Sequence, residues 1–296
     1  MIFSDPSVWV TLVNDEASQA HYLPQLKVFV ADPANPEPSE MIRIMETLDL
    51  ANGSITISYK DGGIEAVQDG QTIYPYRNLM TITGSTSTSN TITVDSSVKN
   101  DYKITLKNAD INIPESGIRV SSGASVEFVL KSNNSATSTS CEKKTDYAAI
   151  EVQSGATATF FGDGTLNAEV SGYGAAIGIK AYYRNGKNHS DNSKFSGIVK
   201  IKGAARRNAT SAYGVGIGGG AINGSSCIQK AFDNGAVYIS EDAIAEATRT
   251  EGYSAGIGGG CYIFTCEATA GDGGVIEAFG NAKVTAKCEN FFRSRP

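Results

Sequence analysis

The sequence predicts an all-β fold: a right-handed, single-stranded parallel β-helix, which is a three-sided solenoid, with a non-repeat N-terminal cap. One observation is a stretch that occurs three times, at Tyr173–Gly178, Tyr213–Gly220 and Tyr253–Gly260, so that its tyrosines recur at a constant spacing. The period of about 40 residues indicates a repeat architecture. A second observation is that each unit holds three short alternating or small-residue runs, each closed by glycine, and then a polar loop. Three strands and a loop describe one coil of a solenoid.

Four units can be laid over one another, and the fourth is incomplete. The units that begin at Gly155 and Gly235 are expected to match without a gap, whereas the unit at Gly197 reaches its tyrosine two residues sooner. The last unit begins at Gly273 and has Phe291 where the tyrosine would fall. Stacked coils would lie about 4.8 Å apart, the ordinary spacing between strands. A β-sandwich or a propeller is the alternative, but its blades need longer strands and a hairpin at every step.

Residues 1–50 lack the repeat and are predicted to form an N-terminal cap or a junction segment. Residues 8–13 and 26–30 have the composition of strands, and 39–48 are expected to form a short helix with Ser39 as its N-cap. A cap is expected because the edge strands of a solenoid are normally covered. Residues 51–296 are assigned to the β-helix, with regular units of about 40 residues from about residue 155.

The C-terminal coil of the predicted solenoid is expected to be open. The sequence stops inside its fourth unit without a capping helix. An uncovered coil is an edge that recruits another strand. We therefore expect a further chain or domain to cover this end.

The predicted interior is aliphatic. Inward positions of the alternating runs carry Ile, Val, Leu and Ala, whereas hydroxyl-rich outward positions fit a strand surface that faces water. The repeated isoleucines are therefore interpreted as packing residues rather than as active ones. Polar loops at 180–196, 221–234 and 261–272 would all leave from one edge of the solenoid and are further places for recognition.

Charge and hydropathy exclude two classes of partner. The net charge is −6 and the basic clusters are short, so a nucleic-acid partner is not expected. The longest apolar runs are far shorter than a membrane span, so no transmembrane segment is expected. The N-terminus also lacks the basic start and apolar core of a signal peptide.

The five cysteines admit two readings. In the register of the repeat, Cys227 falls beside Cys266 in loops of adjacent coils, where a disulfide is geometrically feasible. The alternative is that all five are free thiols, and an odd number leaves at least one unpaired or intermolecular. No C-x-x-C pair occurs, so a zinc site is not expected.

An aromatic ladder is the candidate binding site. Coils stacked in register would align Tyr173, Tyr213 and Tyr253, with Phe291 continuing the series. Exposed aromatic ring faces bind the apolar faces of sugars, with hydroxyls at the rim. The alternative is that these rings point inward or pack corner to corner and only stabilise the solenoid.

Several strings resemble a known family. Residues 104–111, 155–166 and 255–260 are similar to the right-handed β-helix repeats of large secreted or wall-attached proteins of anaerobic and gut bacteria. The family is described as adhesin-like or carbohydrate-binding, and its members share the pectate-lyase type of solenoid. The resemblance implies an extracellular location, or one on the surface of a cell or particle, and a polysaccharide or surface glycan as partner.

An enzyme of the same fold is the first alternative function. A hydrolase needs paired carboxylates, but the sequence signatures of β-helix hydrolases are missing around Asp163. A lyase needs acidic residues that hold Ca²⁺ and a basic residue nearby. Ca²⁺ is therefore expected only if the protein is a lyase, and otherwise no cofactor is expected. The lyase candidates are Asp163 and Glu169 on one unit and Lys200, Lys202, Arg206 and Arg207 on the next.

The favoured hypothesis is a non-catalytic, surface-exposed β-helix that binds glycan or a protein partner as an adhesin-like module. A second alternative is a structural subunit of an appendage, filament or virion, which the open C-terminal coil favours. No catalytic or metal-binding residues are assigned.

Overall fold

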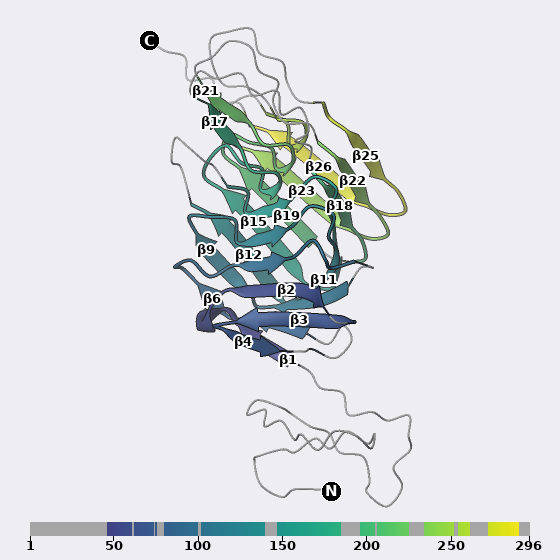
Figure 1. The fold of residues 1–296 in the computed structure, drawn as a ribbon. Coiled ribbons are helices and arrows are strands. Elements are labelled where there is room, and N and C mark those ends of the chain that lie inside the picture. Colours follow the sequence, from purple (N-terminus) through teal and green to yellow (C-terminus); the bar gives the residue numbers. More distant parts are fainter. Residues whose placement is uncertain are drawn as a thin grey trace, which may run out of the picture.

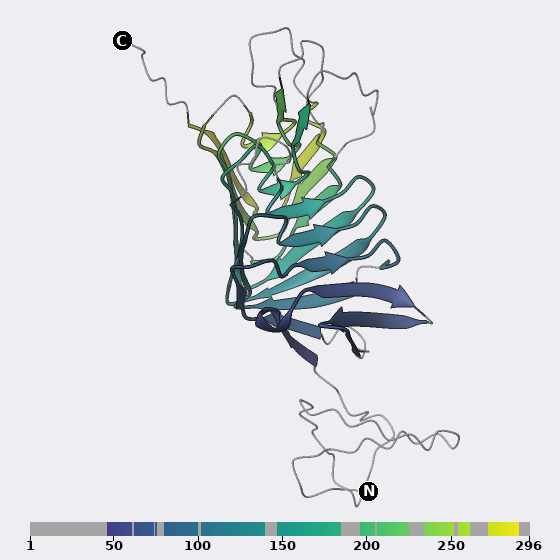
Figure 2. The same cartoon turned by 60° about the vertical axis from the view of Figure 1, so that its left-hand side comes forward.

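The computed structural model describes residues 46–289, apart from 61, 74, 76–79, 100–101, 140–146, 185–195, 205, 225–233, 252–253 and 261–271. These residues form a three-sided parallel β-helix with no α-helix among them (Figures 1 and 2). Each side of the solenoid is one sheet, and neighbouring strands in a sheet come from successive coils. The predicted fold class is confirmed.

Three sheets, named here I, II and III, make the three sides. In order along its length, sheet I contains β1 (Glu46–Asp49), β5 (Met80–Thr83), β8 (Tyr102–Lys107), β11 (Ser125–Lys131), β14 (Thr157–Gly162), β18 (Ile198–Ile201), β22 (Ala236–Ile239) and β25 (Val275–Ala278). Sheet II contains β24 (Ile257–Gly258), β20 (Ile217–Gly218), β16 (Ile177–Gly178), β13 (Ile150–Val152), β10 (Ile118–Val120), β7 (Ile92–Val94), β2 (Ile55–Lys60), β3 (Gly63–Gln68) and β4 (Gln71–Ile73). Sheet III contains β26 (Lys283–Cys288), β23 (Ile244–Arg249), β19 (Arg206–Ser211), β15 (Thr165–Val170), β12 (Asn133–Ser138), β9 (Asp110–Ile113) and β6 (Ser85–Thr86).

The polar loops after β16 and β20 begin with a small extra sheet. Its two strands, β17 (Tyr182–Arg184) and β21 (Ile222–Gly224), pair in parallel. The two loops therefore leave adjacent coils side by side, as predicted for a shared edge.

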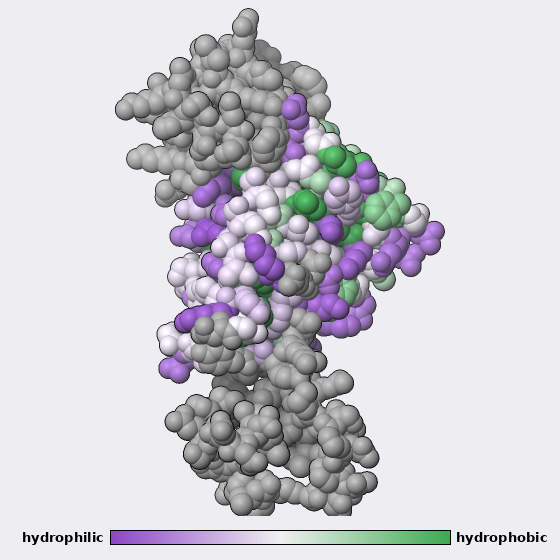
Figure 3. Space-filling model, turned by 45° about the vertical axis from the view of Figure 1, so that its right-hand side comes forward, coloured by the Kyte–Doolittle hydropathy of each residue, from purple (hydrophilic) through white to green (hydrophobic). Residues whose placement is uncertain are grey.

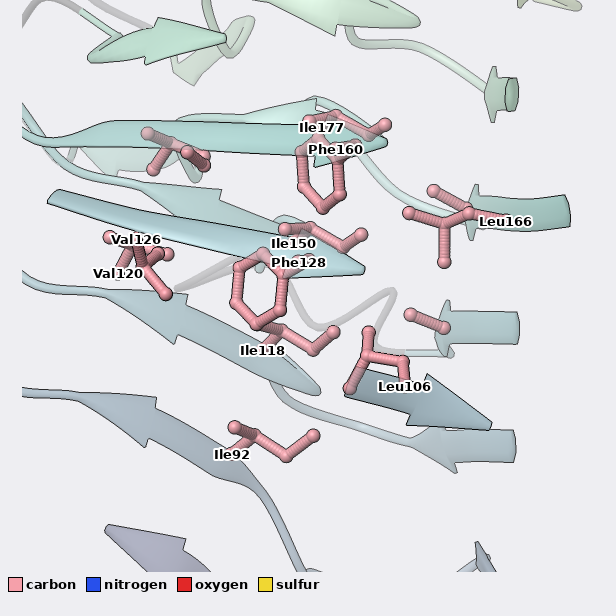
Figure 4. Packing of buried hydrophobic residues seen from close by; sticks show 14 of the residues in the cluster. Ile92, Leu106, Ile118, Val120, Val126, Phe128, Ile150, Phe160, Leu166 and Ile177 are labelled. Atoms are coloured by element: carbon pink, nitrogen blue, oxygen red, sulfur yellow. The ribbon is translucent and has the colours of Figure 1, made fainter. Parts of the chain in front are cut away.

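Alternation along the strands places aliphatic side chains inside the solenoid. In β11, Val126, Phe128 and Leu130 are fully buried in the core. Parallel register repeats this pattern one coil later, where Phe160 stacks on Phe128 with ring centroids 5.4 Å apart (Figure 4). The repeated isoleucines Ile177 and Ile217 pair with each other and are buried, as the sequence predicted. Burial of one such side chain contributes about 1.5–3 kcal/mol.

The glycine after each repeated isoleucine is required by close backbone contact. A Cβ atom on Gly178 would lie 1.9 Å from the carbonyl oxygen of Gly218, and Gly178 has φ of 148°. The register also pairs Gly178 with Gly218 and Gly218 with Gly258. The Ile-Gly pair at the centre of the repeat is therefore explained by backbone geometry.

The N-terminal end departs from the parallel pattern. Strands β2, β3 and β4 form an antiparallel meander that ends sheet II. A single 3₁₀ turn, Leu50–Asn52, follows β1. The side chain of Gln68 in β3 donates hydrogen bonds to the backbone oxygens of Asp49 and Gly53, at 2.6 and 3.0 Å. This meander lies against the first coil (Figure 2).

Two sequence predictions need correction here. The helix expected at 39–48 is wrong at its C-terminal end, because Glu46–Asp49 is strand β1 and pairs with β5. Pairing along sheet I and burial of Leu48 outweigh the local helix signal. The rest of that helix and the strands expected at 8–13 and 26–30 lie outside the described residues.

The gapless match between two repeat units is also wrong. In sheet I, Thr157 pairs with Ile198, which in turn pairs with Ala236. Thr157 and Ala236 lie at the same position two coils apart, but they are one residue closer along the chain than Tyr173 and Tyr253 are. The two units therefore cannot match without a gap. The chain from Arg249 to Ile257 is correspondingly one residue longer than the chain from Val170 to Ile177, which holds the equivalent positions two coils earlier.

Candidate functional site

The predicted aromatic ladder begins at the corner that follows sheet III. Tyr173 and Tyr213 occupy this corner in adjacent coils, and their rings stack with centroids 4.8 Å apart and an interplanar angle of 24°. Both are half-buried. The coils approach closely here, because a Cβ atom on Gly214 would lie 2.1 Å from the carbonyl oxygen of Gly174. The glycine after each tyrosine thus allows the rings to meet.

Stacking determines which parts of the rings a ligand can reach. The facing surfaces of Tyr173 and Tyr213 cover one another, so a sugar at this corner meets ring edges and phenol groups more readily than ring faces. Tyr253 and Phe291, the other predicted members of the ladder, lie outside the described residues. Two of the four predicted residues are therefore brought together.

The cysteine prediction cannot be followed in the described part of the chain. Cys227 and Cys266 both lie outside it. Cys288, in β26, is an exposed free thiol whose sulfur lies 3.5 Å from the backbone oxygen of Ser254, to which it donates.

The residues named for the lyase alternative are dispersed. Asp163 is exposed in the turn between sheets I and III, and Lys131 lies 3.0 Å from its carboxylate and lowers its pKa. Glu169 is an exposed residue of β15. Arg206 forms an ion pair of 3.1 Å with Glu246 in the next coil.

Arg207 is wrong as a candidate base, because it points into the solenoid. Its side chain is fully buried at an inward position of β19, and burial lowers its pKa to about 9. Nη1 donates to the backbone oxygen of Arg206 at 2.8 Å, and the guanidinium lies 5.8 Å from the ring centroid of Phe160. No ligand on the outer surface could reach it.

A cluster on the outer face of sheet I was not predicted from the sequence. It consists of Lys103, Glu127, Phe161 and Lys202, all at outward positions, and is called the sheet I cluster below. The ammonium of Lys202 lies 2.7 Å from Glu127 and 5.1 Å from the Phe161 ring centroid. Lys103 lies 3.8 Å from Glu127 and 5.7 Å from the same centroid.

This cluster combines an aromatic ring with groups of both charges. Phe161 is half-buried, and the two lysine side chains are 48% and 36% exposed, whereas Glu127 is 11% exposed. The ring supplies an apolar surface, the ammonium groups donate hydrogen bonds and the carboxylate accepts them. The alternation within each strand predicts that all four residues face outward. Only the register between successive coils, which the sequence does not give, brings them together.

A second carboxylate between two cations lies on sheet II. Glu151 is 1% exposed, although it points outward from β13, and it pairs with Arg119 at 3.0 Å and with Lys180 at 3.8 Å. Gln153 donates to the same carboxylate at 3.2 Å. Because the carboxylate is buried and held by three neighbours, it serves the structure rather than a ligand.

Comparison of the chain with protein-family models, curated proteins and solved structures yields no match. Function is therefore inferred from the fold and from these surfaces. Within the described ranges, no helix has the length and apolar character to cross a membrane. In the same ranges, no group of three or more His, Cys, Asp or Glu side chains is placed to hold a metal ion.

Proposed function

We propose that the protein is a non-catalytic β-helix that binds a glycan at an extracellular or particle surface, as an adhesin-like module. The observation that carries the proposal is the sheet I cluster, in which the ammonium groups of Lys103 and Lys202 lie near the Phe161 ring and both pair with Glu127. Sugars have an apolar ring face and a rim of hydroxyl groups, and this pairing of ring and polar groups fits both. The resemblance of the repeats to surface adhesin-like proteins agrees with it.

The tyrosine pair is a second surface for the same ligand. Tyr173 and Tyr213 lie in adjacent coils and keep part of their surface exposed, which supports contact with an extended chain. Because their stacked faces are shared, we expect them to contribute less to binding than Phe161 does.

The enzymatic alternative receives less support from the same contacts. A base must be free to reach the substrate, yet Arg207 is buried and Lys202 and Arg206 are held by Glu127 and Glu246. These positions favour binding over polysaccharide cleavage.

A single experiment separates the three functions. The protein is incubated with a panel of neutral and acidic polysaccharides, with and without Ca²⁺, and co-sedimentation, new reducing ends and absorbance of unsaturated sugar are recorded. Retention without cleavage is the expected result. Cleavage would contradict the proposal, and failure to bind any polysaccharide would favour the structural-subunit alternative.

Two variants and a control locate the binding surface. Phe161→Ala is expected to lower the affinity for a retained polysaccharide about fivefold, since an aromatic contact is worth about 1 kcal/mol. Tyr213→Ala should have a smaller effect. Tyr59→Ala removes an aromatic that is 49% exposed on the N-terminal meander and should leave binding unchanged.

A further inference from the structure

Lysine side chains gather on the outer face of sheet I. From β8 to the residue that follows β18, the outward positions carry Lys103, Lys107, Lys131, Lys200 and Lys202. Figure 3 turns forward the side of the solenoid that carries β18 and β22 in Figure 1, and hydrophilic side chains are visible along it. Because the whole chain has a net charge of −6, a basic face stands out from the rest of the molecule.

The acidic groups of this face are matched by lysines. Glu127 in β11 is 11% exposed and pairs with both Lys103 and Lys202, so these three side chains together keep one positive charge. Asp163, in the turn after β14, pairs with Lys131 at 3.0 Å. An anion that approaches the described part of the face therefore meets an excess of positive charge.

Two of the lysines have no carboxylate partner within the described ranges. They are Lys107 and Lys200, and both are exposed. Lys107 also lies directly opposite Lys131 in the parallel register of β8 and β11. Like charges in opposed positions of neighbouring strands are unfavourable. An anion bound between these two ammonium groups would remove their repulsion.

Basic and aromatic side chains alternate across four neighbouring strands. Lys131 lies two residues beyond the register partner of Phe161 in β11, and Lys200 is the register partner of the residue two positions before Phe161. The strand rise and the strand spacing place the Cα atom of each lysine about 8 Å from that of Phe161. Tyr238, the register partner of Lys200 in β22, is half-buried and also points outward. The order across the face is thus lysine, phenylalanine, lysine, tyrosine.

We propose that the glycan bound at the outer face of sheet I is acidic and carries carboxylate or sulfate groups along its chain. This inference rests on the proposed function and names the chemical class of its ligand. A sugar ring covers Phe161, and acidic groups on either side of it accept hydrogen bonds from Lys200 and from the Lys107–Lys131 pair. Such charge-assisted hydrogen bonds are stronger than neutral ones.

The alternation favours an acidic glycan over a nucleic acid. A duplex carries a continuous, dense line of phosphates and is bound mainly through their charge. The net charge of −6 opposes the approach of such a polymer. In an acidic glycan, ring faces separate the charged groups, which matches the aromatic side chains between the lysines.

Paired polymers that share a backbone and differ in charge test the inference. The full chain is titrated with alginate and carboxyl-reduced alginate, and with dextran sulfate and dextran, at about 50 mM and about 500 mM NaCl. At the lower salt concentration, the charged member of at least one pair should bind at least about tenfold more tightly than its neutral member. The difference should shrink at the higher concentration, because salt screens exposed charges.

Two substitutions locate the anion contacts, and a third is a matched control. Lys107→Gln and Lys200→Gln should each weaken binding of the charged polymer about threefold, and the double variant about tenfold. Lys60→Gln removes an exposed ammonium group from the N-terminal meander and should leave the affinity unchanged. Circular dichroism of each variant shows that the solenoid is folded.

The outcomes separate this inference from the proposed function. Failure of both charged polymers to bind, or measurable but equal affinity for the charged and neutral members of both pairs, would overturn the inference. Retention of a neutral polysaccharide would then leave the proposed function standing, whereas retention of none would overturn it as well.

Two further results would also contradict the acidic glycan. One is displacement of the bound polymer by double-stranded DNA at an equal concentration of charge, because charge alone would then account for binding. The other is a loss of affinity in Lys60→Gln as large as that in Lys200→Gln, because the lysines of sheet I would then have no special part in binding.

Discussion

Lys202 reaches across an entire strand to meet Glu127. Its ammonium lies 2.7 Å from the Glu127 carboxylate, although Glu127 belongs to β11, Lys202 follows β18, and β14 lies between these strands in sheet I. The same ammonium lies 5.1 Å from the centroid of the Phe161 ring, which belongs to the intervening β14. One ion pair therefore ties together three consecutive coils on the outer face.

The first prediction concerns the strength of this ion pair. Lys202→Met removes the ammonium but keeps an unbranched side chain at this position, and it leaves the poorly exposed Glu127 with Lys103 as its one cationic partner among the described residues, so stability should fall by about 1 kcal/mol. Urea unfolding of Lys202→Met, Glu127→Gln and the double variant gives the coupling energy. A coupling energy near zero would mean that the pair is fully screened by water.

The second prediction concerns the buried cation of Arg207. Leu166 occupies the same inward position one coil earlier, so Arg207→Leu should fit the core. Among the described residues, no carboxylate pairs with this guanidinium, and its replacement by an apolar side chain should stabilise the fold by about 1–4 kcal/mol. Thermal or urea unfolding at pH 7 measures this gain, and a loss of stability would contradict it.

The sign of the pH dependence provides a check on the same variant. Burial lowers the Arg207 pKa from its ordinary value in the unfolded chain to about 9 in the fold. The wild-type chain therefore bears the full cost of the buried cation below pH 9 and regains stability as the pH rises above 9. The advantage of Arg207→Leu should shrink over that range.

The third prediction concerns a strained turn between sheets I and III. Glu241 has φ of 61°, and the equivalent residues of the neighbouring coils are Gly203 and Gly280, with φ of 73° and 72°. Glu241→Gly should stabilise the protein by about 0.5–1 kcal/mol, because glycine adopts this conformation without steric cost. Glu241→Ala keeps the Cβ atom and should give no such gain in urea unfolding.

The fourth prediction concerns alkaline unfolding. Tyr102 is a core residue of β8 whose hydroxyl is buried without a hydrogen-bond partner in the described part of the chain, and burial raises its pKa from 10.0 to about 12. The neutral phenol is favoured in the fold, so the wild-type chain loses stability as the pH rises from 10 toward 12. Tyr102→Phe should remove this part of the loss.

Unfolding at pH 8 and pH 11 tests that expectation. At pH 8 the variant should be as stable as the wild type or up to about 1 kcal/mol more stable, because an unsatisfied hydroxyl is removed. At pH 11 its relative stability should increase. An equal difference at both pH values would show that Tyr102 does not titrate in the unfolding transition.

The solenoid itself could be predicted because its signal repeats. The isoleucines Ile177, Ile217 and Ile257 are evenly spaced along the chain and pair in one column of sheet II. The alternation of apolar and polar residues within a strand is a local pattern, so each short run of sequence indicates which of its residues face inward. The corner tyrosines followed from the same spacing, and the stack of Tyr173 on Tyr213 followed from the register.

The features that escaped prediction depend on tertiary context. The hydrogen bonds of the β2–β4 meander and of Gln68 form only once the first coil is in place. Arg207 was named among the basic residues of the lyase alternative, yet strand alternation places it inside the solenoid, where arginine is rarely found. The Glu127–Lys202 pair joins residues 75 positions apart in the chain, which no local pattern reveals.

Coil length varies without any change in how the sheets pair. Along sheet I, Ser125, Thr157 and Ile198 are consecutive register partners, yet the chain between Thr157 and Ile198 is longer than the chain between Ser125 and Thr157. The register of sheet I is kept in spite of the extra residues, and each doubling of loop length costs only about 0.6 kcal/mol. The segments between strands can thus be lengthened, exchanged or duplicated with their coil during evolution while the scaffold stays the same. Changes confined to these segments can therefore give a new binding specificity without a new fold.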